Sequence, residues 1–275
     1  MKINTLAVSL AFTGLLSSLA VSHAAFAHEN VALDTVISSD FRAAKNSARD
    51  QYRHPKQTLE FFDVKPTDTV VELWPGGGWY AEILAPYLAE KGHYIGGNFD
   101  GNPVDEAKRN GYRAKAGRKF EQWLSENKTK LGNATTVTFE PPLNYTLGDD
   151  SSADVVLTFR NLHNWAMKGY LEPVFKSAYN VLKSGGTFGI VEHRANPGMD
   201  AKTGYMDQAE MIALAEKSGF TFVASSEVNA NAKDTKDYPK GVWTLPPRLA
   251  LDEQDKEKYL AIGESDRMTL KFIKK

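Results

Sequence analysis

Residues 69–88 read TVVELWPGGGWYAEILAPYL, and this stretch decides the fold. The β-branched run at 69–73 is typical of a buried strand, which the glycines at 76–78 end. From Trp79 to Ala89 the apolar residues follow at helical spacing, until Gly92 stops the helix. A glycine turn between a strand and a helix lies at the carboxyl edge of an α/β sheet, where free amides and the helix dipole favour ligands.

The same alternation of short strands and helices continues along the chain. Further strands are expected at 93–97, 135–139, 154–159, 187–192, 220–225 and 268–273, with helices at 55–62, 103–131, 171–182, 207–218 and 251–262. Ser184-Gly185-Gly186 is expected to be a turn before the fifth strand. This order predicts one doubly wound α/β domain with a mostly parallel sheet. It leaves open whether the polar loop at 229–247 is a substrate lid.

The N-terminus predicts export. Lys2 precedes an apolar stretch at 6–21, and Ala25-Phe26-Ala27 fits a cleavage site. We therefore expect a signal peptide at 1–27, a helical arm at 28–58 and the main domain at 59–275. The expected location is periplasmic or secreted, with no membrane insertion after cleavage, although an uncleaved anchor is the alternative.

Composition narrows the chemistry. The 275 residues contain no cysteine, which excludes disulfides, thiolate metal sites and cysteine nucleophiles. The formal net charge is -1, and nothing global favours nucleic acid as a partner. The expected partner is a small-molecule substrate.

The glycine turn fits two ligand classes. Gly76-x-Gly78-x-x-Ala81 matches the dinucleotide pattern, which expects an acid about 20 residues further on. Asn98 stands near that place, and Asp100 follows it. A third interpretation is a tight turn that needs glycine for packing alone.

Three motifs resemble class I S-adenosylmethionine-dependent methyltransferases. VVELWPGGG at 70–78 is similar to the first motif, DVVL at 154–157 with NLH at 161–163 to the fourth-strand motif, and LKSGGT at 182–187 to the segment before the fifth strand. WPGGGWY at 74–80 most resembles a subgroup of predicted exported bacterial methyltransferases. The resemblance implies a seven-stranded sheet whose last strand, near 268–272, lies antiparallel between the fifth and sixth.

The resemblance also implies a site for S-adenosylmethionine. The residues that it assigns to the cofactor are Glu72, Trp74, Gly76, Gly77, Gly78, Asn98, Asp100 and Asn161, with Glu72 near the methionine end. Two of them depart from the family, which usually has glycine at position 74 and an acid at position 98. An indole at position 74 would narrow the pocket or stack on part of the cofactor. Nucleoside binding therefore depends on the space that Trp74 leaves at the 76–78 turn.

Polar residues follow the fourth and fifth strands, at 160–165 and 192–194. Both groups should open into one crevice, since parallel strands end at the same edge. His163, Glu192 and Arg160 are the candidate catalytic residues, with His163 as base or substrate orienter. Plain ion pairs of Glu192 with Arg194 or Arg160 are the alternative. Arg53 and His54 are placed to close over the crevice.

A metal ion is not predicted. His163, His193 and Glu192 could in principle meet around one, but they come from separate strand ends without helical ligand spacing. The leading hypothesis is methyl transfer from S-adenosylmethionine to a small molecule in the cell envelope. The alternatives are a catalytically inactive ligand-binding protein on the same scaffold and, less favoured, a nicotinamide-dependent oxidoreductase.

Overall fold

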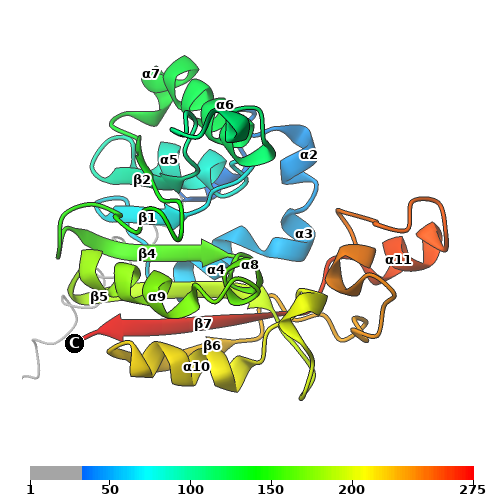
Figure 1. Ribbon diagram of the computed structural model, residues 1–275. Coiled ribbons are helices and arrows are strands. Elements are labelled where there is room, and N and C mark those ends of the chain that lie inside the picture. The colour runs from blue at the N-terminus through cyan, green and yellow to red at the C-terminus, as the bar shows by residue number, and fades with distance from the viewer. Residues whose placement is uncertain (1–32) are drawn as a thin grey trace, which may run out of the picture.

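The computed structural model describes residues 33–275, so the expected signal peptide lies outside the described residues. The chain forms one seven-stranded sheet in the order β3-β2-β1-β4-β5-β7-β6 (Figure 1). The strands are β1 Thr69–Leu73, β2 His93–Asn98, β3 Thr135–Thr138, β4 Ala153–Phe159, β5 Leu182–His193, β6 Phe220–Ser226 and β7 Arg267–Lys274. β7 is antiparallel to both neighbours, whereas the other pairs are parallel. This confirms the predicted α/β fold and its antiparallel last strand.

The predicted turn at 184–186 is wrong, because β5 already begins at Leu182. Leu182 pairs with Ala153, and the register then shifts before Val155 pairs with Thr187. Gly185 has a φ of 79°, a conformation that suits glycine in a bulge. The three residues therefore form an irregular part of the strand.

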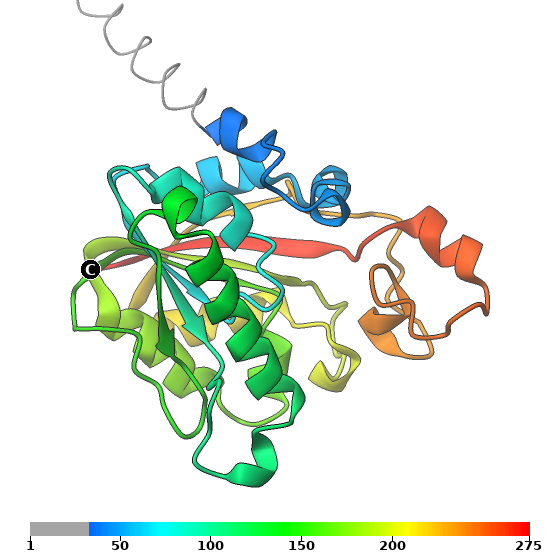
Figure 2. The same cartoon turned by 90° about the horizontal axis from the view of Figure 1, so that it is seen from above.

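Helices cover both faces of the sheet, as Figure 2 shows. They are α2 Ala44–Ser47, α3 Asp50–Arg53, α4 Pro55–Phe61, α5 Ala81–Leu88, α6 Tyr112–Glu126, α7 Lys128–Leu131, α8 Leu162–Ala166, α9 Leu171–Val181, α10 Gln208–Lys217 and α11 Lys256–Ile262, with short 3-10 turns at Glu106–Lys108, Ala201–Thr203 and Gly241–Thr244. α8 was not predicted, and α11 begins five residues later than expected. Among residues 33–275, no helix is both long and apolar enough to cross a bilayer.

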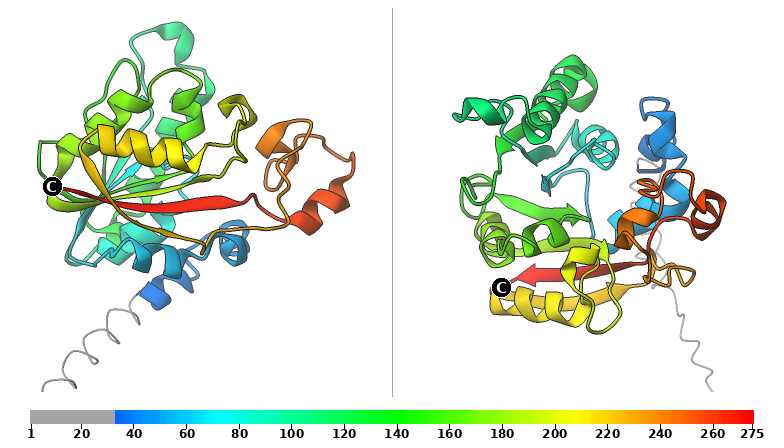
Figure 3. Two further views of the ribbon diagram at one scale, coloured as in Figure 1. Left: turned by 90° about the horizontal axis from the view of Figure 1, so that it is seen from below. Right: turned by 45° about the vertical axis from the view of Figure 1, so that its right-hand side comes forward.

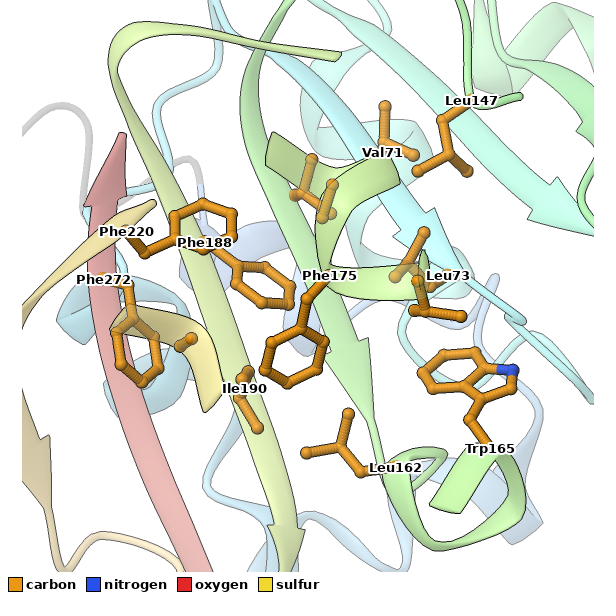
Figure 4. Packing of buried hydrophobic residues seen from close by; sticks show 14 of the residues in the cluster. Val71, Leu73, Leu147, Leu162, Trp165, Phe175, Phe188, Ile190, Phe220 and Phe272 are labelled. Carbon is orange, nitrogen blue, oxygen red and sulfur yellow. The ribbon is translucent and has the colours of Figure 1, made fainter. Parts of the chain in front are cut away.

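Successive residues of β1 pack into two different hydrophobic clusters of the core. Val70 packs in a cluster with α4, α5 and α6, whereas Val71 packs in a cluster with α8, α9 and α10. In the second cluster the Phe188 ring lies 5.3 Å from that of Phe175 and 4.9 Å from that of Phe220 (Figure 4). Burying each such side chain contributes about 1.5–3 kcal/mol. The packed core therefore holds in place the strand ends that carry the polar residues.

The N-terminal arm is fastened to the carboxyl edge of the sheet. Asn46 of α2 donates to Glu82 Oε1 at 2.9 Å. Arg49 and Arg53 pair with Glu264, which lies just before β7, at 2.6 and 3.1 Å. Figure 3 shows the arm and the segment between β6 and β7 at this same end of the molecule. Two segments distant in sequence thus enclose the edge where ligands bind on this fold.

Candidate functional site

A cavity of about 340 Å³ opens at the glycine turn between β1 and α5. Its walls come from that turn, α3, the segment after β4, the 242–248 segment and residues 264–265. The long polar loop between β6 and β7 therefore does form part of a wall over the carboxyl edge. Arg53 lines the cavity as predicted, whereas His54 does not.

The glycine turn presents only part of itself to this cavity. Gly76 and Gly77 line it, and a Cβ added at Gly77 would meet no neighbouring group within 4 Å. Gly78 has a φ of 79°, and an added Cβ would lie 3.6 Å from the Phe120 ring of α6. Gly76 and Gly77 are thus placed to approach a ligand, whereas Gly78 shapes the turn and packs inward.

Glu72 lines the cavity from the end of β1. The side chain is buried, and it accepts a hydrogen bond from the Tyr94 hydroxyl at 2.7 Å. Burial raises the pKa of Glu72 to about 7, although the bond from Tyr94 opposes this rise. Asn161 also lines the cavity, and its amide donates to the Leu73 carbonyl at 2.9 Å. This bond fixes the end of β1 against the segment that follows β4.

Trp74 keeps the backbone geometry of a glycine. Its φ is 47°, in the left-handed region where a bulky residue is strained by about 1–2 kcal/mol. The indole is buried, and Nε1 donates to the Phe139 carbonyl at 2.8 Å. Its ring centroid lies 4.8 Å from those of both Phe99 and Trp165. The indole is therefore packed into the core beside the cavity.

The other side of the Trp74 indole faces a second cavity through Arg113. The Arg113 guanidinium lies 4.6 Å from the Trp74 ring centroid and pairs with Glu140 at 2.5 Å. Arg113, Glu140 and Asp100 line this second cavity, whose volume is about 870 Å³. Trp74 and Arg113 thus form a wall between the two cavities.

Asn98 lines neither of the two cavities. It is 1% exposed, and its Nδ2 donates to the Gly117 carbonyl at 3.1 Å. Its buried Oδ1 has no hydrogen-bond partner. The amide holds α6 against β2, so the ribose-binding role implied by the resemblance has no open surface here.

The eight residues assigned to the cofactor are therefore not brought together. Glu72, Trp74, Gly76, Gly77 and Asn161 line the first cavity, Asp100 lines the second, and Gly78 and Asn98 line neither. Three of the eight residues, Asp100, Gly78 and Asn98, therefore lie away from the cavity that the other five line. The physical reasons differ: the Trp74 indole occupies space that glycine would leave open, Gly78 packs toward Phe120, and Asn98 is bonded to the Gly117 carbonyl of α6.

Glu192 lies beneath the cavity and orients His163. Its Oε2 accepts from the Leu162 amide at 2.5 Å, and its Oε1 accepts from the His193 amide at 2.8 Å. His163 Nδ1 lies 3.1 Å from Oε1, so an ionised Glu192 accepts a proton-bearing Nδ1 and leaves Nε2 as the acceptor. The Asn164 amide lies 3.1 Å from Nε2. His163 lines the cavity, whereas Glu192 is fully buried and positions it.

The predicted ion pairs of Glu192 with Arg194 and Arg160 are wrong. Arg194 lies just beyond β5, where Glu227 and Asp266 bracket its guanidinium at 2.7 and 2.9 Å. Arg160 follows β4 with a φ of 61°, and its amide donates to the Val191 carbonyl at 2.7 Å. Its side chain lines the cavity. Burial lowers the pKa of Arg160 to about 10, where it still keeps its charge at neutral pH.

The ligand atoms of His163, Glu192 and His193 lie within 4.8 Å of one another. β4 and β5 are neighbours, so their ends bring together residues that local spacing kept apart. Both Glu192 oxygens already accept amide hydrogen bonds, and His193 Nδ1 lies 2.5 Å from Ser265 Oγ. Burial lowers the pKa of His193 well below its usual value. These side chains have hydrogen-bond partners within the protein and need no ion to provide them. The absence of a metal stays a prediction.

The sequence did not predict two of the wall residues, Arg49 and Glu264. They are 215 positions apart in the chain, so no local spacing could connect them. Trp243 is a third missed wall residue, and its ring centroid lies 5.8 Å from that of His163. A charged arm before the first strand was the one available signal.

No protein-family model matches the chain, and no curated protein matches it. Solved structures do match. They include the [4+2]-cyclase SpnF, with 16% identity, 86% of this chain and 84% of that chain covered, and a TM-score of 0.51. A protein from Pyrococcus horikoshii has 13% identity, coverage of 86% and 94%, and a TM-score of 0.51. An S-adenosylmethionine-dependent methyltransferase from Methanosarcina mazei has 13% identity, coverage of 78% and 96%, and a TM-score of 0.50.

At these identities the likeness shows the fold. The chain has the architecture of S-adenosylmethionine-dependent methyltransferases, as the sheet order also shows. A cyclase and a methyltransferase are both among the similar structures, so the architecture alone does not fix the reaction.

Proposed function

We propose that the protein is an S-adenosylmethionine-dependent methyltransferase that acts on a small molecule. The observation that supports this most is the joint position of Gly77, Glu72 and His163 in one cavity at the carboxyl edge of this fold. An open glycine edge allows a ligand to approach the backbone, and a histidine opposite offers a proton acceptor. The volume of about 340 Å³ suits a small ligand.

The residues present fit the methionyl part of the cofactor better than its nucleoside part. Gly76 and Gly77 offer an open backbone edge, and Glu72 offers a carboxylate for an ammonium group. S-adenosylmethionine would supply a methyl group on a positively charged sulfur. In the conformation described here, Trp74 occupies space beside this surface, so the nucleoside part does not fit.

The proposal therefore requires Trp74 to move. The wall of Trp74 and Arg113 has a cavity on each side, which gives the indole space to enter. Movement of the indole would break the Nε1 bond to the Phe139 carbonyl. A binding-competent form that is sparsely populated lowers the apparent affinity by its population. We expect wild-type protein to bind the cofactor weakly for this reason.

His163 is the residue best placed to accept a proton from an acceptor molecule. Glu192 fixes its ring through Nδ1, and the remaining nitrogen, Nε2, is held only by the Asn164 amide. Trp243 covers the ring from the loop between β6 and β7, which limits access of water. The chain thus orients a base in an enclosed space, which is what transfer to an oxygen or nitrogen nucleophile needs.

Transfer of label tests the proposal. The processed chain is incubated with methyl-labelled S-adenosylmethionine and a library of small metabolites, and labelled products are separated. We expect label in at least one metabolite, and a His163→Gln variant should lose about 10²-fold or more of the rate. Absence of label from every metabolite and of cofactor binding would remove the proposal.

A second candidate is a ligand-binding protein without catalysis. Trp74 and Asn98 favour it, because one fills and the other closes surface that a nucleoside would use. Cofactor binding by Trp74→Gly alone, with none by wild type, would support this candidate. A nicotinamide-dependent oxidoreductase has no comparable support, and titration with reduced nicotinamide cofactor, followed by fluorescence, tests it directly.

We also propose that the protein works outside the cytoplasm. The support is the n-region, apolar stretch and cleavage pattern of residues 1–27. N-terminal sequencing of the protein from each cell fraction tests this. We expect a chain that starts at His28 in the envelope or the medium, and a chain that starts at Met1 in the cytoplasm would contradict it.

A further inference from the structure

We propose that the cavity at the glycine turn recognises a carboxylate or phosphate group on the methyl acceptor, and that Arg160 and Arg53 bind this anion. As a statement about the acceptor, the inference rests on the proposed function. The anion site itself rests on the charge and hydrogen bonding of the cavity walls.

Positive charge exceeds negative charge in these walls. The lining arginines are Arg49, Arg53, Arg160 and Arg248, and the lining carboxylates are Glu72 and Glu264. Glu264 is already shared, because it also pairs with Arg267 at 3.3 Å behind the wall. Glu72 bonds to Tyr94 and faces none of these arginines in an ion pair. The cavity therefore holds cations that its own carboxylates do not balance.

Arg160 has no anionic partner in the described chain. Its guanidinium makes no hydrogen bond and no ion pair within 4.0 Å with any of residues 33–275. The nearby charges that act on it are Glu264 and Glu192, which favour its charged form, and Arg267 and Arg49, which oppose it. Arg160 is half-buried and its guanidinium has no partner among the described residues, so a bound anion would stabilise this arrangement through charge-assisted hydrogen bonds.

Arg53 supplies a second, preoriented group. Its side chain is 2% exposed, its Nε donates to Glu264 at 3.1 Å, and its guanidinium lies 4.6 Å from the Trp79 ring centroid. Nη2 of Arg53 is buried without a partner, as is Nη2 of Arg49. A fixed guanidinium with unused donors matches the geometry of carboxylate and phosphate oxygens.

The protonation behaviour agrees with this geometry. Burial is the main cause that lowers the pKa of Arg53 well below its usual value, and the charge of Arg160 is the next. An anion bound between the guanidinium groups of Arg53 and Arg160 would offset their mutual repulsion. Burial lowers the pKa of His193 and keeps its imidazole neutral, so the positive charge of the site comes from the arginines.

Titration with simple anions tests the site without any methyl transfer. The processed chain is titrated by calorimetry with inorganic phosphate, pyrophosphate and citrate at low salt. We expect binding, and Arg160→Gln should weaken it by about tenfold or more, since charge-assisted bonds are lost. Arg109→Gln is the matched control, because Arg109 is half-buried, pairs with the exposed Glu106 and lines neither cavity. It should leave the affinity unchanged.

Two results would overturn the site: no binding of any of the three anions by wild-type protein, or equal weakening by Arg160→Gln and Arg109→Gln. Circular dichroism of both variants checks that they are folded. Because the Arg160 side chain bonds to no protein group, its removal should not disturb folding.

The carboxylate of the cofactor is the other source of an anion. Repeating the titration with saturating S-adenosylmethionine separates the two sources. Anion binding that persists supports recognition of the acceptor, whereas competition would show that the arginines hold the cofactor and would overturn the inference. If the cofactor does not bind but phosphate does, the proposed function fails and the anion site stands.

Discussion

The two cavities on either side of the Trp74–Arg113 contact differ in how many of the residues assigned to a cofactor line them. On the glycine-turn side, Glu72, Gly77 and Asn161 line a cavity together with four arginines. On the other side lies a larger cavity whose residues include only Asp100 among those assigned to the cofactor. One large side chain, in contact with Arg113, thus stands between these residues and the larger cavity. The fold therefore accommodates a large side chain at a position where the resemblance expects glycine.

The backbone at this position explains how the division leaves the fold intact. Trp74 adopts a φ of 47°, and its amide still donates to the Gly97 carbonyl at 2.8 Å. The backbone of the turn therefore has the geometry that a glycine would adopt, and only the indole side chain differs from glycine. Substitutions of Trp74, Glu72 and Arg113 should separate three contributions to stability. These are the packing of the indole, the buried Glu72 carboxylate and the ion pair of Arg113 with Glu140.

Trp74→Gly should have the largest effect on stability. Removing a buried aromatic side chain costs about 3–5 kcal/mol, and relief of the left-handed backbone returns about 1 kcal/mol. We expect a net loss of about 2–4 kcal/mol in urea unfolding, with the two cavities joined. Trp74→Phe is the control, since it keeps a ring and loses the bond to Phe139. An unchanged unfolding free energy in Trp74→Gly would show that the indole does not form the wall.

Glu72→Gln should change stability on the glycine-turn side in a pH-dependent way. The folded pKa of Glu72, about 7, lies above its unfolded value of 4.5. Stability from this group is full below pH 4.5 and is lost as the pH rises through 7. The variant should therefore gain roughly 2–3 kcal/mol over wild type at pH 8 and nothing near pH 4. Thermal unfolding at both values measures this, with exposed Glu90→Gln as control. A gain of equal size at both pH values would contradict the shifted pKa.

Arg113→Met should have the smallest effect of the three, on the far side of the indole. It removes the cation–π contact with Trp74 and a partly exposed ion pair with Glu140. Together these contribute about 1 kcal/mol. Urea unfolding measures the loss, and added salt should reduce the difference from wild type. A loss above about 3 kcal/mol would mean that Arg113 holds the wall closed.

The fold was predictable because its signals are local. A few residues are enough to indicate each element. This holds for the strand at 69–73, the glycine turn after it and the strands near the C-terminus. The bulge at Gly185 was not predictable, since it depends on a register shift between β5 and Ala153. The turn residues look the same whether they end a strand or lie inside one.

The site was predictable only in part. Strand ends brought His163 and Glu192 together as expected, because parallel neighbours end at one edge. The pairing of Arg49 with Glu264 was not visible, since it joins an arm to a loop across the whole domain. Trp74 was recognised as a departure, but the direction of its side chain depends on packing with Phe99 and Trp165. Packing of this kind cannot be derived from sequence spacing.

Calorimetric titration of wild type and Trp74→Gly with S-adenosylmethionine tests most directly whether the indole divides a working cofactor site. We expect weak binding by wild type and binding tighter by about tenfold or more in Trp74→Gly, equivalent to about 1.4 kcal/mol no longer needed to displace the indole. Absence of heat from both proteins at millimolar cofactor would contradict it.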